Sequence, residues 1–238
     1  ILTKITFSTT GTIADTLTVT NLATTNATIT ITLNANVNAT NFTLASVNSN
    51  VTINGNYNLN ISGQFQTAFS TSNQLQGTST IVLNGSANII KSSLTTSNMR
   101  IGSNLVFNSS GTIDIQNNDI VMLNNATLTY TSGTINYNGY YIAVGNCSLD
   151  FGGASLQNLK ILTTGTTTSL KSEVRITGDF LGTAPTAVAI STINSNSAGT
   201  QRKLTLDPAA TQLSNFVTFT DIDASGGRKI WVWRPTLS

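Results

Sequence analysis

Apolar and polar residues alternate along most of this chain with a period of two. Because successive side chains of a β-strand point to opposite faces, this period predicts strands with one buried and one exposed face. We find no convincing helical stretch of ten or more residues. The alternation is clearest in five predicted strands: Thr16–Thr20, Ala27–Leu33, Val51–Ile53, Thr112–Ile115 and Ala126–Tyr130.

Turn-forming pairs separate the predicted strands at short intervals. Asn-Gly and Ser-Gly are typical of tight turns, because Gly and, to a lesser degree, Asn tolerate left-handed backbone conformations and Ser can hydrogen-bond the nearby backbone. The chain is therefore expected to reverse or bend at each pair. The clearest pairs are Asn54–Gly55, Asn84–Gly85, Ser110–Gly111, Ser132–Gly133 and Asn138–Gly139.

The sequence also repeats itself weakly. Val51–Tyr57 aligns without gaps to Val174–Phe180, and both segments place Val, Ile, Gly and an aromatic residue at the same spacing. A repeated strand-and-turn module indicates stacked, similar units. Two alternate residues of each copy are expected to face the core: Val51, Ile53, Val174 and Ile176. The residues between them, Thr52 and Arg175, are expected to face outward.

The charge pattern bears on how the strands are arranged. Charged residues make up only 8% of the chain, 29 residues are Asn, and no charged side chain occurs from Thr16 to Ile90. Soluble sheet proteins usually place charges on exposed sheet edges, which otherwise pair with other chains. Stacked coils protect these edges by pairing each strand on both sides, and Asn and Thr can form hydrogen-bonded ladders between coils.

These observations predict an all-β fold, a right-handed parallel β-helix (β-solenoid) of roughly ten coils. A β-sandwich would explain the alternation and the turns equally well, but not the charge-free surface or the repeat. We expect a single domain over residues 1–238. The chain starts and stops within the pattern, so we expect it to be a segment of a larger polypeptide.

Several kinds of chemistry are disfavoured by composition. The chain has no His and one Cys, which removes Ser-His-Asp and Cys-His mechanisms and makes a zinc site improbable. The net charge is +2 and the basic residues are scattered, so nucleic acid is not an expected partner. No apolar stretch approaches 18 residues, so membrane insertion is not expected. No catalytic, cofactor-binding or metal-binding residue is predicted.

Two places near the C-terminus still deserve comparison with chemical sites. Asp221 and Asp223 would share one face of a strand about 7 Å apart, a spacing compatible with glycoside hydrolysis. Turn hydrogen bonding near Ser225 is the simpler interpretation, and the stretch also half matches a calcium loop without its downstream Glu. The other place holds four residues expected to cap the solenoid or contact a partner or sugar: Arg228, Lys229, Trp231 and Trp233.

The lone cysteine, Cys147, lies in a predicted strand, where a small buried residue is expected.

The stretch Phe219–Trp233, preceded by Lys203–Leu206 and Leu213–Phe216, resembles segments of β-helical tail fibre and tailspike proteins of bacteriophages. The body of the chain, as in Val51–Tyr57 and Ser148–Gly153, is similar both to phage fibre shafts and to haemagglutinin-type bacterial adhesins. The resemblance implies a repeated virion appendage that contacts the host surface. It transfers no catalytic residue.

We therefore expect a structural and adhesive virion component that is not an enzyme and needs no cofactor. Expected partners are other copies of the chain, with a trimer favoured by the resemblance, other virion proteins, and a host surface glycan. The alternative is a bacterial adhesin, secreted or on the cell surface. A polysaccharide-degrading tailspike is a third interpretation.

Overall fold

The computed structural model describes residues 3–20, 28–45, 49–69, 73–94, 97–162, 165–183, 190–215 and 217–231, and these ranges contain strands, turns and no helix. The chain divides into two compact units, residues 1–121 with 131–140 and residues 122–130 with 141–238. In each unit, parallel strands stack as a β-solenoid. The described residues make about eight turns, close to the roughly ten expected. The parallel β-solenoid is thus confirmed. Its right-handedness and the assignment of residues 1–238 to a single domain stay predictions.

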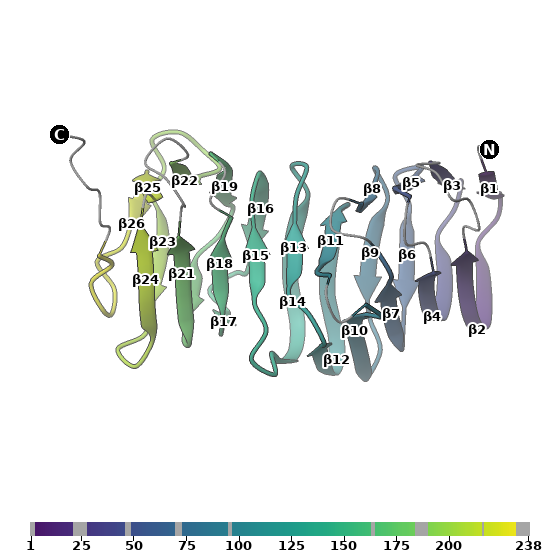
Figure 1. The fold of residues 1–238 in the computed structure, drawn as a ribbon, viewed down its shortest axis with the longest axis horizontal. Helices are drawn as coiled ribbons and strands as arrows, with labels where there is room; N and C mark the ends of the chain where they lie inside the picture. Colours follow the sequence, from purple (N-terminus) through teal and green to yellow (C-terminus); the bar gives the residue numbers. More distant parts are fainter. Residues whose placement is uncertain are drawn as a thin grey trace. The chain divides into compact units, whose positions relative to one another are not determined.

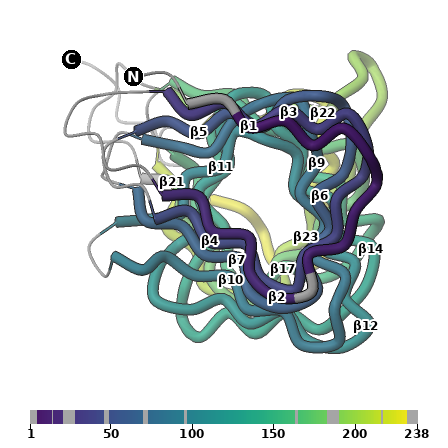
Figure 2. The backbone as a smooth tube through the Cα atoms, turned by 90° about the vertical axis from the view of Figure 1, so that its right-hand side faces the viewer, coloured from purple at the N-terminus to yellow at the C-terminus, as the bar shows by residue number. Residues whose placement is uncertain are grey.

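The first unit builds two parallel sheets (Figures 1 and 2). One sheet contains β1 (Thr3–Phe7), β3 (Ile29–Leu33), β5 (Val51–Asn54), β8 (Leu75–Gln76) and β11 (Met99–Gly102). The other contains β2 (Gly11–Thr20), β4 (Val37–Ala45), β6 (Asn58–Ile61), β7 (Gln64–Thr67), β9 (Thr80–Leu83), β10 (Ala87–Ser92) and β12 (Leu105–Gln116). Strands β13 (Ile120–Met122) and β14 (Thr127–Asn136) include residues of both units.

The second unit builds three parallel rows of strands. The first row is β15 (Ile142–Val144), β18 (Leu159–Ile161), β21 (Asp179–Thr183) and β24 (Thr211–Asn215). The second is β16 (Cys147–Asp150), β19 (Thr167–Leu170), β22 (Ser191–Ser195) and β25 (Val217–Thr220). The third is β17 (Ser155–Leu156), β20 (Val174–Ile176), β23 (Arg202–Leu206) and β26 (Ile222–Asp223).

Alternate residues of these strands stack into the interior, as the period of two requires. In the first unit, Ile29 pairs with Val51, Val51 with Leu75, and Leu75 with Ile101, and each is at most 2% exposed. The four predicted core residues, Val51, Ile53, Val174 and Ile176, are all fully buried, Thr52 is half-buried and Arg175 is exposed. The predicted register is therefore correct in both units.

Asparagine side chains join successive turns of the solenoid. The backbone N–H of Gln64 donates to Asn41 Oδ1 (2.8 Å), and the N–H of Gln74 donates to Asn50 Oδ1 (3.0 Å). The same contact occurs in the second unit, where the N–H of Thr167 donates to the side chain of Asn146 (2.9 Å). Backbone donors at the corners, which no neighbouring strand can satisfy, thus find partners in the adjacent turn. Such contacts give one physical reason for Asn at these corners.

Glycines allow the turns to approach closely at the corners. A Cβ at Gly55 would lie 1.7 Å from the carbonyl oxygen of Leu33, and one at Gly77 would lie 2.1 Å from that of Ile53. Both glycines also have φ near +125°, which other residues rarely adopt. Only glycine fits these two positions.

The expectation that a turn-forming pair separates two strands was wrong at two of the five pairs. Ser110–Gly111 and Ser132–Gly133 lie inside the long strands β12 and β14 instead of separating strands. In β12, the N–H groups of Ser110 and Thr112 donate to Gly85 and Ser86 of the preceding turn, so pairing continues around the bend. The aligned repeats also occupy different sheets, because β5 belongs to the first sheet of its unit and β20 to the third row of the other.

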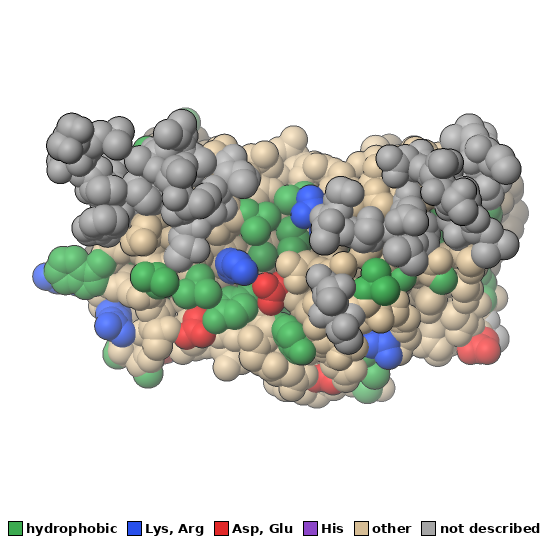
Figure 3. All heavy atoms as spheres, in the orientation of Figure 1, with side chains coloured by type: hydrophobic (Ala, Val, Ile, Leu, Met, Phe, Trp, Pro, Cys, Tyr) green, Lys and Arg blue, Asp and Glu red, His purple; other side chains and the backbone are tan. Residues whose placement is uncertain are grey.

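Figure 3 shows one face of the molecule, where the described atoms are mostly neutral polar or backbone and charged side chains are few. None of the described residues forms a helix with the length and apolar character needed to cross a membrane.

Candidate functional site at the end of the second unit

The polarity of the strand pattern inverts at β24. In the row formed by β15, β18, β21 and β24, the buried residues Leu159 and Phe180 pair with one another, and Phe180 pairs with Gln212. At the next inward position Ile161 pairs with Gly182, and Gly182 pairs with Ser214. A stack of apolar residues thus ends in an amide and a hydroxyl.

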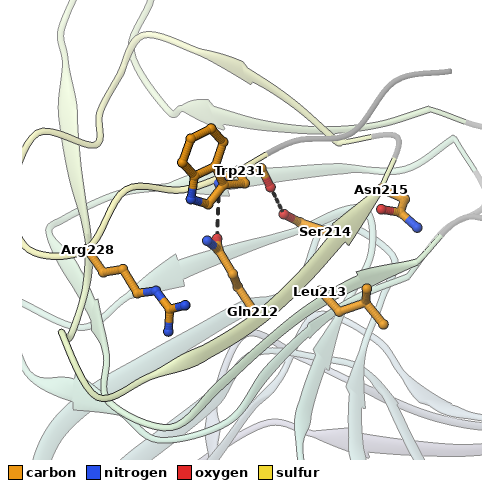
Figure 4. A pocket seen from close by; sticks show the side chains of 6 residues that line it. All are labelled: Gln212, Leu213, Ser214, Asn215, Arg228 and Trp231. Carbon is orange, nitrogen blue, oxygen red and sulfur yellow. Dashed lines mark hydrogen bonds between the residues drawn. The ribbon is translucent and has the colours of Figure 1, made fainter. Parts of the chain in front are cut away.

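These two inward polar groups hold the segment that follows the last described strand. Gln212 Oε1 accepts a hydrogen bond from the N–H of Trp231 (3.1 Å), and its Nε2 donates to the carbonyl of Lys229 (2.9 Å). Ser214 Oγ donates to the carbonyl of Trp231. The side chains of β24 therefore bond backbone groups of residues 229–231 much as a neighbouring strand would, and the segment lies against β24 (Figure 4).

A depression of about 270 Å³ opens between β24 and this segment. Its lining includes the two most exposed large apolar side chains among the described residues, Leu213 at 54% and Trp231 at 67%. Asn215 and Arg228 add polar groups, and one guanidinium N–H of Arg228 donates to the carbonyl of Ala210 (2.5 Å). The depression thus combines an indole face with amide and guanidinium donors.

The structure brings together three of the four C-terminal residues singled out in the sequence. Lys229 and Trp231 contact β24 through the hydrogen bonds just described, whereas Arg228 bonds the carbonyl of Ala210, the residue before β24. Trp231 lies outside any strand. Trp233 lies outside the described residues. Sequence reasoning missed Gln212, whose inward position follows from the period of two but whose amide had no predicted partner.

The acidic pair does not share one face of a strand as expected. Asp221 precedes β26 and has a left-handed φ of 54°, and its carboxylate accepts from the N–H of Gly199 (2.9 Å). Asp223 accepts from the N–H of Ser225 (2.9 Å), which confirms the predicted turn hydrogen bonding. The hydrogen bonds from the Ser225 side chain and backbone, with a smaller contribution from the Lys203 charge, lower the pKa of Asp223. Both carboxylates therefore accept hydrogen bonds from backbone N–H groups and stabilise turns.

Two other carboxylates of the second unit join strands of successive turns. Asp179 accepts from Thr211 Oγ1 and from the Tyr141 hydroxyl (2.8 Å), and these bonds lower its pKa. Asp207 accepts from the Arg175 guanidinium at 2.5 Å, and that hydrogen bond is the main cause of its lowered pKa. Within the described ranges, no three His, Cys, Asp or Glu residues cluster in a way that could hold a metal ion.

Cys147 lies in β16 and is 3% exposed, as predicted. Burial raises the pKa of its thiol to about 12, against the opposing effect of hydrogen bonds from the Gly145 backbone and the Thr168 side chain. A thiol with this pKa is neutral at physiological pH and is a poor nucleophile.

Comparisons with protein-family models, with curated proteins and with solved structures find no match to this chain.

Proposed function

We propose that this chain is a structural and adhesive module of a phage appendage, of the tail fibre or tailspike kind. The observation that carries the proposal is the bonding of successive turns by neutral side chains, as at Asn41 and Asn50. Neutral contacts of this kind do not weaken with salt or with moderate changes of pH. They suit a protein that works outside a cell.

The alternative is a bacterial adhesin, secreted or on the cell surface, which is compatible with the same fold and the same neutral polar side chains. The resemblance of Phe219–Trp233 to phage virion segments favours the phage appendage. A polysaccharide-degrading enzyme is the weakest candidate, because the carboxylates of Asp221 and Asp223 are already bonded to backbone N–H groups.

Immunogold electron microscopy tests the location. Antibodies raised against the purified chain are applied to cultures that carry its gene, before and after induction of any resident phage. Gold on virion tails supports the proposal, and gold on the bacterial envelope without virions selects the adhesin. Gold confined to the cell interior contradicts both, and serum absorbed with the purified chain is the control.

Self-association is part of the proposal, because a surface with few charges has little repulsion between copies. We expect a homo-oligomer, with a trimer favoured by the resemblance. Light scattering after size-exclusion chromatography gives the mass directly. A monodisperse monomer at protein concentrations on the order of tens of micromolar contradicts self-association.

Enzymatic activity is tested separately. Purified protein incubated with capsular polysaccharide from the host should leave the length of the polysaccharide unchanged. Chain shortening that disappears in Asp221→Asn or Asp223→Asn would make the protein a depolymerase.

A further inference from the structure

A groove with a volume of about 260 Å³ lies across strands of the first unit. One wall is a row of outward residues from successive turns, in which Thr12 pairs with Asn38 and Asn38 with Asn60. Asn60 Nδ2 donates to Asn38 Oδ1 (2.8 Å). Within the described part of the chain, Asn38 Nδ2 and Asn60 Oδ1 have no hydrogen bond, so a donor and an acceptor remain for a ligand.

The other wall repeats in the same way. Thr40, Ser62 and Asn84 follow the inward positions of three successive turns, as the backbone bonds of Ser62 N–H to Ala39 and of Asn84 N–H to Ile61 show. All three residues are exposed. The buried Ala39 lies between the two walls in sequence and its side chain points inward, so the floor between Asn38 and Thr40 is formed by the strand backbone.

The lining fixes the class of ligand. No charged residue contributes to the groove, and none occurs in the sequence from Thr16 to Ile90. A phosphate or carboxylate would lose water there without gaining a counter-charge. Amides and hydroxyls can both donate and accept, which is what the hydroxyl groups of a sugar require. Ile13 and Ala39 are the apolar residues of the lining, too few to hold the apolar side chains of a peptide.

We propose that this groove binds a neutral, extended oligosaccharide. The walls repeat once per turn, at the strand spacing of about 4.8 Å, so similar hydrogen-bonding groups recur along the groove. Affinity should therefore rise with the number of sugar units until the oligomer is longer than the groove. Binding of such a ligand would serve the host attachment proposed above, and its biological role rests on that proposed function.

Isothermal titration of the purified full chain tests the groove. The probes are maltohexaose, cellohexaose, a mannose hexamer and, as the acidic comparison, a galacturonic acid hexamer. We expect at least one neutral hexamer to bind and the acidic hexamer not to bind. Asn60→Ala removes one amide from the wall and should weaken binding about tenfold.

The matched control is Asn194→Ala. Asn194 is also a half-buried neutral residue bonded to the preceding turn, accepting from Ser169 Oγ (2.7 Å), but it belongs to the second unit and does not line the groove. It should leave binding unchanged, and both variants should keep the wild-type melting temperature within a few degrees. The proposal is wrong if no neutral hexamer binds, if the acidic one binds best, or if both variants lose affinity equally. The location found by immunogold labelling is independent of all three outcomes.

Discussion

The two units solve one structural problem with different regularity. In the first unit, paired residues of neighbouring turns lie between 22 positions apart, as for Ile29 and Val51, and 26 apart, as for Leu75 and Ile101. In the second, the separation ranges from 17 positions for Ile142 and Leu159 to 32 for Phe180 and Gln212. Strand pairing tolerates this variation because the extra residues lie in the connections between strands.

The units also differ in the groups that bond one turn to the next. Six of the charged residues belong to the first unit and fourteen to the second. Neutral amides dominate the contacts of the first unit, as between Asn38 and Asn60, whereas carboxylates of Asp179 and Asp207 make comparable contacts in the second. Hence the same backbone stacking is compatible with two surface chemistries, and the interior, not the surface, defines the fold.

The largest expected effect tests whether the two interiors are equivalent. Ile53→Asp and Ile176→Asp each place an unpaired charge at a fully buried position. Each should lower the free energy of unfolding by about 4 kcal/mol or more, because a buried charge without a partner is costly. Urea denaturation measures both. Thr52→Asp, at the neighbouring half-buried position, is the control and should cost less than about 1 kcal/mol.

If Thr52→Asp were severe and Ile53→Asp mild, the register would be shifted by one residue. If only one of the two core variants were destabilised, the interiors would differ and the comparison between the units would fail.

A smaller effect is expected at Asn88, a fully buried amide of the first unit. Its Nδ2 donates to the carbonyls of Ile61 (2.9 Å) and Gly63 (3.1 Å), and its Oδ1 accepts from the N–H of Gly85 (2.9 Å). Asn88→Ala leaves these groups without that partner and should cost about 2–3 kcal/mol in thermal or urea unfolding. The exposed Asn108→Ala should change stability by less than about 0.5 kcal/mol, and equal losses would contradict the role of burial.

Acid should destabilise the second unit more than the first. The pKa values of Asp179, Asp207 and Asp223 are lowered in the folded protein, so their stabilising contribution is present above the ordinary carboxyl pKa. It is lost as the pH falls through the lowered folded values, below about pH 4. As the pH is lowered, hydrogen exchange, corrected for its intrinsic pH dependence, should show that the second unit loses protection at a higher pH than residues 51–69. Simultaneous loss in both units would contradict the distinction drawn from their charges.

The smallest effect concerns the thiol of Cys147. Since burial raises its pKa to about 12, the native protein should not react with a thiol reagent such as dithionitrobenzoate at pH 8 within the time in which urea-unfolded protein reacts fully. Rapid reaction of the native protein would mean that the interior of the second unit opens more readily than its burial indicates.

Much of the fold could be predicted because the period of two directly reports which residues face inward. Val51 and Val174 show that this local rule works in both units. The repeat that contains them could not predict which sheet each copy occupies, because connections of different length place the same motif on different sides of a turn. The expected ladder between like side chains occurs where Asn60 Nδ2 donates to Asn38 Oδ1 (2.8 Å). Asn41 and Asn50 instead accept from backbone N–H groups of the next turn, a contact that composition did not predict.

The candidate site was less predictable. Alternation placed Asp221 and Asp223 on one face, but a left-handed φ at Asp221 ends that alternation, and Asp can adopt this conformation without a distinctive sequence signal. Leu213 is 54% exposed, and no sequence pattern predicted this. Its neighbours Gln212 and Ser214 take the inward positions because a backbone segment, which no local pattern reveals, crosses there.

The stacking of parallel turns has a mechanical consequence. The hydrogen bonds between turns run across the strands, so a force that draws the chain out from one end of the first unit loads these bonds a few at a time and removes one turn after another. Each turn of 22 to 26 residues would release roughly 75 to 90 Å of extended chain. Extension would then proceed in steps of similar length, with the remaining turns still folded, and the protein would yield gradually under load without losing its whole structure at once.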